Sequence, residues 1–427
     1  MRVGKQVVSW GESTFIQNSI NAINPLDVAA LRRPGAEIKE GLIPVNMFYL
    51  SQGLSENLTA EAFYQLEWEK TIVDNCGTFF ASDVAAPGCT DRLVLAGADL
   101  PQGDPAGNVA NAYMQRLKDN DARDGGQFGV ALRWFVPSLN DTEFGVYALN
   151  YHSRNPLLNT VHSTASLANP LAAIRNSGYF LDYPEDIRLY GLSFQTNVEG
   201  TSLGGEVSYR PNMPLQLSSP DFINAALGNP ASPLYTTGFA SNVLGASVPA
   251  YKRMPVLQAQ MTATQFFDQV WGADRLTLVG EVGYNRINGL GSADGTDLRF
   301  GRGPSFGSGV LPGAANAACL NPASNPQQEC NSHGFHTTDS WGYRARAKLD
   351  YSNVIAGINL SPNLAWSHDV DGWGPNFEEG AKAISLGVDA DYLSTYTASL
   401  SYTDFFDGQF NTSIDRDFVA LSVGVNF

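Results

Sequence analysis

The sequence predicts an all-β protein, a large antiparallel transmembrane β-barrel of about fourteen strands with long external loops and short periplasmic turns. Three observations predict this fold. Charged residues are scarce, apolar and polar side chains alternate along many segments, and the connections between those segments are alternately long and short. We expect residues 1–427 to form a single barrel domain.

Charged residues make up 16% of the chain, whereas soluble globular proteins contain roughly 25%. A barrel tolerates so few charges because its outer surface meets lipid. No segment has the roughly 18 to 20 consecutive apolar residues of a transmembrane helix, so the chain can span a membrane only as a closed barrel. The net charge of −16 argues against nucleic acid as a partner. The acidic excess lies largely in predicted loops, where solubility and binding of divalent cations are the two interpretations.

The alternation of side chains is clearest at the C-terminus. Within residues 417–427, small or polar residues alternate with Val419, Leu421, Val423, Val425 and Phe427. A period of two indicates a strand with one apolar and one polar face. The same pattern recurs at 58–68, 128–134, 203–210, 276–285, 341–351, 358–367, 384–392 and 396–402, and more weakly at 2–9, 43–50, 142–152, 186–198 and 253–267. Phe63 interrupts the polar set of its strand.

The connections alternate strictly in length. Counting back from Phe427, the long ones lie near 407–415, 370–381, 287–340, 212–252, 153–185, 70–125 and 10–42. The short ones lie near 393–394, 352–353, 268–273, 199–201, 137–141 and 51–55. With Phe427 at the periplasmic end, every long connection is external, as in outer-membrane barrels.

Tryptophans are expected at the membrane boundary, because the indole ring is apolar while its N–H needs a partner. Trp10, Trp68, Trp341 and Trp366 fall at predicted external strand ends, and Trp134 falls at a periplasmic end. The alternative is that they are core tryptophans of a soluble sheet.

The four cysteines form two local pairs, Cys76 with Cys89 and Cys319 with Cys330. Each pair lies in a loop-like stretch, and no Cys-x-x-Cys metal motif is present. Two disulfides within loops, formed in an oxidising compartment, are the simplest interpretation.

Several motifs resemble a proteobacterial family catalogued as domain of unknown function 1302. They occupy residues 2–13 (RVGKQVVSWGES), 23–28 (INPLDV), 31–41 (LRRPGAEIKEG), 64–68 (YQLEW) and 359–374. The resemblance implies the outer membrane of a Gram-negative bacterium and an association with uptake or degradation of hydrophobic compounds. It also implies a longer protein. Because residues 1–5 enter a strand-like segment directly, we expect an upstream signal peptide and N-terminal strands to be missing from this sequence.

The polar faces of the strands should line a lumen. The predicted pore-lining residues are Glu61, Arg133, Glu206, Arg210, Glu281, Arg344, Arg346, Lys348, Asp369 and Asp389. Opposed charges across a pore would orient polar solutes. The alternative is a set of cross-strand ion pairs that fill the interior. In the loop 10–42, Arg32 and Arg33 are predicted to point into a constriction.

Other motifs give only weak evidence for a metal site or for catalysis. Cys330, His333 and His336 have metal-like spacing, but a disulfide would consume the thiolate. Asp369 to Gly372 starts like a calcium loop and lacks its later Glu. The sequence Gly303-Pro304-Ser305-Phe306-Gly307 matches a nucleophile elbow without the required strand and helix. We therefore expect no enzyme, no metal and no cofactor.

The leading functional hypothesis is an outer-membrane channel or carrier for small molecules, hydrophobic ones included. The alternative is a non-conducting scaffold or assembly partner whose lumen is plugged by the loops 70–125 and 287–340. Expected partners are outer-membrane lipid and lipopolysaccharide, the barrel assembly machinery that would read Phe427, and a periplasmic or inner-membrane transport protein.

Overall fold

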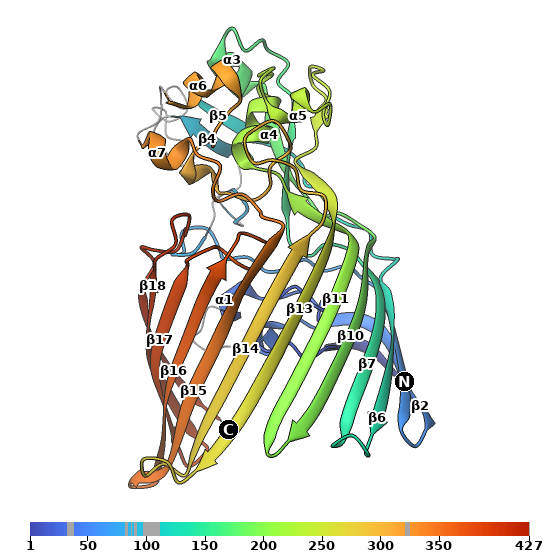
Figure 1. Ribbon diagram of the computed structural model, residues 1–427, viewed down its shortest axis with the longest axis vertical. Helices are drawn as coiled ribbons and strands as arrows, with labels where there is room; N and C mark the ends of the chain where they lie inside the picture. Colours follow the sequence, from blue (N-terminus) through green and yellow to red (C-terminus); the bar gives the residue numbers. More distant parts are fainter. Residues whose placement is uncertain are drawn as a thin grey trace.

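The computed structural model describes residues 1–31, 38–81, 84–86, 88, 92–96, 112–320 and 325–426. Its main element is a wall of 14 strands (Figure 1) in the order β1-β2-β3-β6-β7-β10-β11-β13-β14-β15-β16-β17-β18-β19. All neighbours in this order pair antiparallel. The predicted all-β fold with about fourteen barrel strands is confirmed. In the described part of the chain, no helix has the length and apolar character needed to cross a bilayer.

The strands of the wall coincide with the fourteen alternating segments of the sequence. Their bounds are β1 (Arg2–Gln6), β2 (Val45–Ser55), β3 (Leu58–Gln65), β6 (Phe128–Val136), β7 (Thr142–Tyr151), β10 (Ile187–Val198), β11 (Thr201–Gln216), β13 (Tyr251–Asp268), β14 (Arg275–Ile287), β15 (Asp339–Ile355), β16 (Ile358–Asp371), β17 (Lys382–Tyr392), β18 (Tyr396–Phe406) and β19 (Phe418–Val425).

The wall is apolar outside and polar inside. On β10 and β11, the paired residues Leu192 and Val207 are 59% and 42% exposed. The next pair along the same strands, Ser193 and Glu206, is buried at 7% and 3%. A soluble sheet would bury the apolar pair, so this inverted arrangement is the one that a lipid environment stabilises.

Short turns join the strands at one end of the wall, which we call the short-turn end. Glu199 and Gly200 form a two-residue turn in which both have positive φ, and Ala356 and Gly357 form another. The predicted turn at 352–353 is therefore wrong by a few residues. Asn353 does have positive φ, but it lies in an irregular stretch of β15 and not in the turn. The predicted turn at 51–55 is likewise displaced, because β2 continues to Ser55.

The long connections at the other end build a cap above the wall (Figure 1). A second sheet of five strands has the order β12-β8-β9-β5-β4. Its strands are β4 (Arg92–Ala96), β5 (Ala112–Arg116), β8 (Leu157–Val161), β9 (Gly178–Asp182) and β12 (Ser247–Val248). Around it lie α3 (Pro170–Arg175), α4 (Ser219–Ala226), α5 (Pro233–Thr236), α6 (Ala317–Leu320) and α7 (Pro326–Glu329), with the 3-10 turns η2 (Pro304–Phe306) and η3 (Gly313–Asn316).

The first connection, between β1 and β2, takes a different course. It contains α1 (Val28–Leu31) and η1 (Ile38–Gly41). Its first part, residues 7–27, contacts the inner face of the wall, and we call it the lumenal segment. It packs in a core cluster with residues of β2, β3, β6, β7 and β10, in which Trp10, Ile20 and Ile23 are its largest side chains.

Candidate functional site

Two inward carboxylates hold the lumenal segment. Glu281 on β14 accepts hydrogen bonds from the backbone N–H groups of Thr14, Phe15 and Ile16, at 2.9, 2.6 and 2.7 Å. Glu206 on β11 accepts from the N–H groups of Glu12 and Ile20. Each carboxylate thus satisfies several donors that would otherwise be buried without partners.

Arg210 on β11 also holds the lumenal segment, by donating hydrogen bonds to backbone carbonyl oxygens of the segment. Its guanidinium donates to the carbonyl oxygens of Asn18 and Ser19, at 2.6 Å each, and to the Tyr151 hydroxyl at 2.8 Å. Together with Glu206, it fixes the segment through charge-assisted hydrogen bonds from one strand.

Trp10 is buried in the lumen and does not lie at a membrane boundary. Only 1% of it is exposed, and its Nε1–H donates to Glu61 Oε2 at 2.6 Å. Its ring lies 5.2 Å from that of Phe63 and 5.8 Å from that of Tyr147. The boundary prediction for Trp10 is therefore wrong. The interruption of the polar set at Phe63 has a physical reason, because this inward aromatic side chain packs against Trp10.

Most of the remaining predicted pore-lining residues contact near neighbours in the wall. Arg133 lies 3.3 Å from Glu61 and 2.7 Å from Glu143, both on adjacent strands. Arg344 pairs with Asp369 on the adjacent strand at 2.7 Å. Lys348 lies 3.0 Å from Asp350 of its own strand, and Asp389 accepts a hydrogen bond from Asn363 at 3.0 Å. These contacts run along the wall and do not oppose one another across the lumen.

A cavity of about 600 Å³ lies between the lumenal segment and the inner face of β15–β19. The segment contributes Phe15, Gln17 and Leu26, and the stretch after β3 contributes Thr71, Val73 and Phe80. The wall contributes one set of register partners running from Arg344 through Ser367 and Ala383 to Phe405, and a second running from Arg346 through Ala365, Ser385 and Thr403 to Phe418.

The aromatic residues of this cavity were not singled out in the sequence. Phe405 and Phe418 occupy positions in their strands whose neighbours on the same face are small or polar. The available signal was the one that Phe63 also gave, an aromatic residue on a polar face. Such a residue requires an apolar partner inside the lumen.

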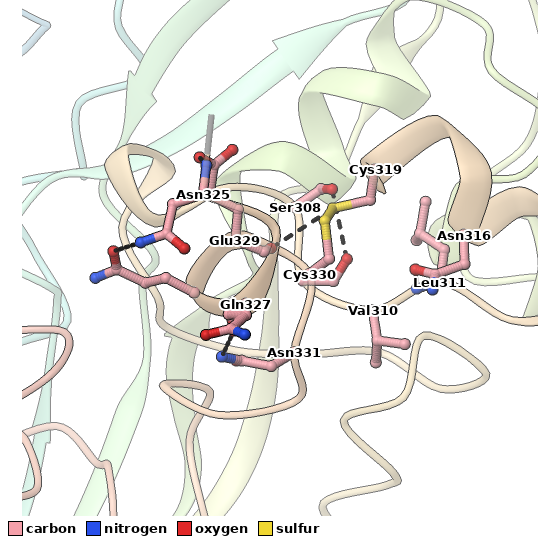
Figure 2. The surroundings of a disulfide bond; sticks show 12 residues. Ser308, Val310, Leu311, Asn316, Cys319, Asn325, Gln327, Glu329, Cys330 and Asn331 are labelled. Atoms are coloured by element: carbon pink, nitrogen blue, oxygen red, sulfur yellow. Dashed lines mark hydrogen bonds between the residues drawn. A yellow bond between two sulfur atoms is a disulfide. The ribbon is translucent and has the colours of Figure 1, made fainter. Parts of the chain in front are cut away.

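The cap contains the disulfide between Cys319 and Cys330, which is confirmed (Figure 2). Nearby, the buried Arg299 and Asp221 form an ion pair with an Nε–Oδ2 distance of 2.9 Å. Burial lowers the pKa of Arg302 to about 10. Its guanidinium donates to the backbone carbonyl oxygens of Phe306, Gln328, Glu329, Asn331 and His333, of which Gln328 and Glu329 lie in the disulfide loop, residues 319–330.

Several predicted residues lie outside the described part of the chain. These are Arg32 and Arg33 of the proposed constriction, Cys89, and Phe427. Cys76 is bonded in a disulfide, while its pairing with Cys89 stays a prediction. Within the described ranges, no group of three or more His, Cys, Asp or Glu side chains is placed to hold a metal ion.

The geometry of the wall and its lumenal segment can be set beside known proteins. The family model described as a protein of unknown function (DUF1302) matches residues 1–427, the whole chain. The chain belongs to this family. The resemblance is thus confirmed, and in this DUF1302 member the motif at residues 2–13 forms β1 and the beginning of the lumenal segment.

No curated protein matches this DUF1302 chain. Among solved structures, it is similar to a mutant ferric enterobactin receptor of Pseudomonas aeruginosa, with 14% identity over 84% of this chain and a TM-score of 0.37. The chain spans only 40% of that receptor's length.

Two further solved structures are similar. A FadL homologue of Pseudomonas aeruginosa is 12% identical over 85% of this chain and 70% of its own, with a TM-score of 0.30. The siderophore receptor PirA of Acinetobacter baumannii is 10% identical over 88% of this chain and 54% of its own, with a TM-score of 0.33. Similarities of this size assign no activity.

Proposed function

We propose that the protein is an outer-membrane channel or carrier for small molecules, hydrophobic ones included. The observation that carries the proposal is the cavity of about 600 Å³ that lies between the wall and the lumenal segment. In this proposal the cap faces the exterior of a Gram-negative cell and the short-turn end faces the periplasm. Lipopolysaccharide, the barrel assembly machinery and a periplasmic or inner-membrane transport protein stay predicted partners.

The way in which the lumenal segment is held supports passage through the lumen. Among the described residues, positions 7–24 form no β-ladder with the wall, and their backbone is fixed mainly through the side chains of Glu206, Arg210 and Glu281. Displacing the segment would break these side-chain bonds without opening the sheet. The segment is therefore the part of the lumen that we expect to move during passage.

Conductance in planar bilayers tests the proposal. We compare the wild-type protein with Glu281→Ala, which removes the acceptor of three segment N–H groups. Asp389→Ala is the matched control, because this inward carboxylate contacts Asn363 of the wall. We expect the Glu281 variant to conduct severalfold more than both other proteins. If none of the three proteins shows either current or solute flux, the proposal is contradicted.

A second candidate is a non-conducting scaffold, which the buried core around Trp10 favours. In this version the lumenal segment would plug the lumen together with the part of the loop 70–125 that lines the cavity, at Thr71, Val73 and Phe80. The loop 287–340 contributes η2, η3, α6 and α7 to the cap. A scaffold would remain closed in the Glu281 variant. Its contribution to the integrity of the cell envelope would also be unchanged in a variant whose cavity is filled by a bulkier side chain.

A further inference from the structure

The charged side chains among the described residues that line the cavity have one sign. Among the described residues that line it, Arg344 and Arg346 are charged and none is acidic. Arg344 pairs with Asp369 at 2.7 Å, and Asp369 itself lies outside the lining. In a partly water-excluded site, two guanidinium groups favour an anionic ligand over a neutral or cationic one.

The opposite side of the cavity is aromatic. Phe80 reaches it from the stretch after β3, with its ring 5.7 Å from that of Phe418 and 6.5 Å from that of Phe405. The rings of Phe405 and Phe418 lie 6.4 Å apart. These three rings form an apolar surface that we call the aromatic end of the cavity.

The register of the wall sets the order of the chemistry between the two ends. From β15 to β19 the inner face passes from guanidinium groups, through the hydroxyls of Ser367, Ser385 and Thr403, to the aromatic end. Neighbouring strands lie about 4.8 Å apart, so three strand spacings from β15 to β18 span roughly 14 Å. This distance is the length over which a bound molecule would change from charged to apolar.

We infer that the cavity binds an amphipathic carboxylate, with its anionic group at Arg344 and Arg346 and its apolar body toward the aromatic end. Carboxylates match the planar guanidinium fork, and the apolar body gains by removing the aromatic surface from water. Because Arg344 is shared with Asp369, the ligand competes for that group and is held reversibly. The inference rests on the proposed function, for which it names the substrate class.

Equilibrium binding of dodecanoate tests the inference. The protein is reconstituted in lipid nanodiscs, and empty nanodiscs correct for partition of the probe into lipid. Dodecanol and dodecylamine provide a neutral and a cationic probe with the same chain. We expect dodecanoate to bind at least about tenfold more tightly than either, which corresponds to about 1.4 kcal/mol. Equal binding of the three probes, or no binding above empty nanodiscs, would overturn the inference.

Variants locate the binding site. Arg346→Gln should weaken dodecanoate binding about tenfold, and Arg346→Lys should restore part of it because the charge is kept. Lys348→Gln is the matched control, since Lys348 is a cation on the same face of the same strand that does not line the cavity. Phe405→Ala should weaken binding of dodecanoate and dodecanol alike. Equal losses in the Arg346→Gln and Lys348→Gln variants would reject the assigned site.

Flux separates this inference from the proposed function. Binding of dodecanoate without transfer across a proteoliposome membrane would overturn the channel or carrier proposal and leave the binding site standing. Passage of small neutral sugars without selective dodecanoate binding would overturn the binding site and leave the channel standing. Circular dichroism and heat-modifiable gel migration verify that each variant is folded.

Discussion

At the scale of single residues, Gly283 shows how closely the wall and the lumenal segment approach. A Cβ atom added to Gly283 would lie 2.8 Å from Ile16 Cδ1 and 3.1 Å from Phe377 Cζ. On the same strand, a Cβ at Gly280 would meet no heavy atom within 4 Å. The side chain at position 283 must therefore be absent for the segment to sit in place.

We expect Gly283→Ala to destabilise the seating of the lumenal segment by on the order of 1 kcal/mol, and Gly280→Ala to leave it unchanged. Hydrogen exchange of the segment's amides measures this directly. A loss of 1 kcal/mol would appear as exchange about fivefold faster at Thr14 to Ile16. Equal exchange in the two variants would show that the segment is not packed on β14.

His336 in the cap links local stability to pH. Burial lowers the pKa of its imidazole from 6.5 to about 4. Between these two values the unfolded chain binds a proton that the folded chain does not bind, so stability falls as the pH falls from 6.5 toward 4. The full loss is at most about 3 kcal/mol, and no further loss from this group occurs below pH 4.

Hydrogen exchange of residues 325–338, corrected for intrinsic rates, checks this prediction. The local unfolding free energy of the wild-type protein should decrease between pH 7 and about 4.5. His336→Leu should lose that dependence, because the variant has no group to protonate at this position. The same slope in both proteins would assign the effect to other groups.

At the scale of elements, the disulfide loop of the cap has two independent supports. The bond between Cys319 and Cys330 closes a sequence separation of 11 residues. Arg302 holds the end of the same loop by donating to the backbone carbonyl oxygens of Gln328 and Glu329. A cross-link over so short a loop stabilises it by about 3 kcal/mol in the chain-entropy account.

We expect the double variant Cys319→Ser with Cys330→Ser to speed hydrogen exchange in residues 304–336. Exchange in β13 and β14 should not change, because the wall strands are held by their own ladders. Faster exchange in the wall strands of the double variant would show that cap and wall unfold together.

At the scale of the whole molecule, the alternation of side chains between the two faces of each strand explains which parts of the fold could be predicted from the sequence. Each wall strand must show one face to lipid, so even a short segment such as β19 alternates detectably. The cap strands have no such constraint. β8, with the sequence LLNTV, shows no alternation, and β5 pairs in parallel with a strand far along the chain. The cap sheet was therefore missed, and its residues were assigned to loops.

The alternation predicted which face of the wall each site residue points to, but it did not predict its hydrogen-bond partners. Glu206 and Glu281 were assigned to the inner face, yet their partners are backbone N–H groups of the lumenal segment. Nothing in the local sequence specifies such contacts, because they join positions far apart in the chain. Trp10 was misplaced for the same reason, since its strand-end position hid its packing against Phe63.

In a barrel that spans the bilayer, one face of the wall meets hydrocarbon and the other meets the lumen. Nitroxide labels placed singly along β17 test this arrangement, at Leu386 and Val388 on one face and at Gly387 and Asp389 on the other. We expect high accessibility to oxygen, which dissolves in lipid, at Leu386 and Val388, and low accessibility at Gly387 and Asp389. Accessibility that is uniform along β17, or that is higher at Gly387 and Asp389, would contradict it.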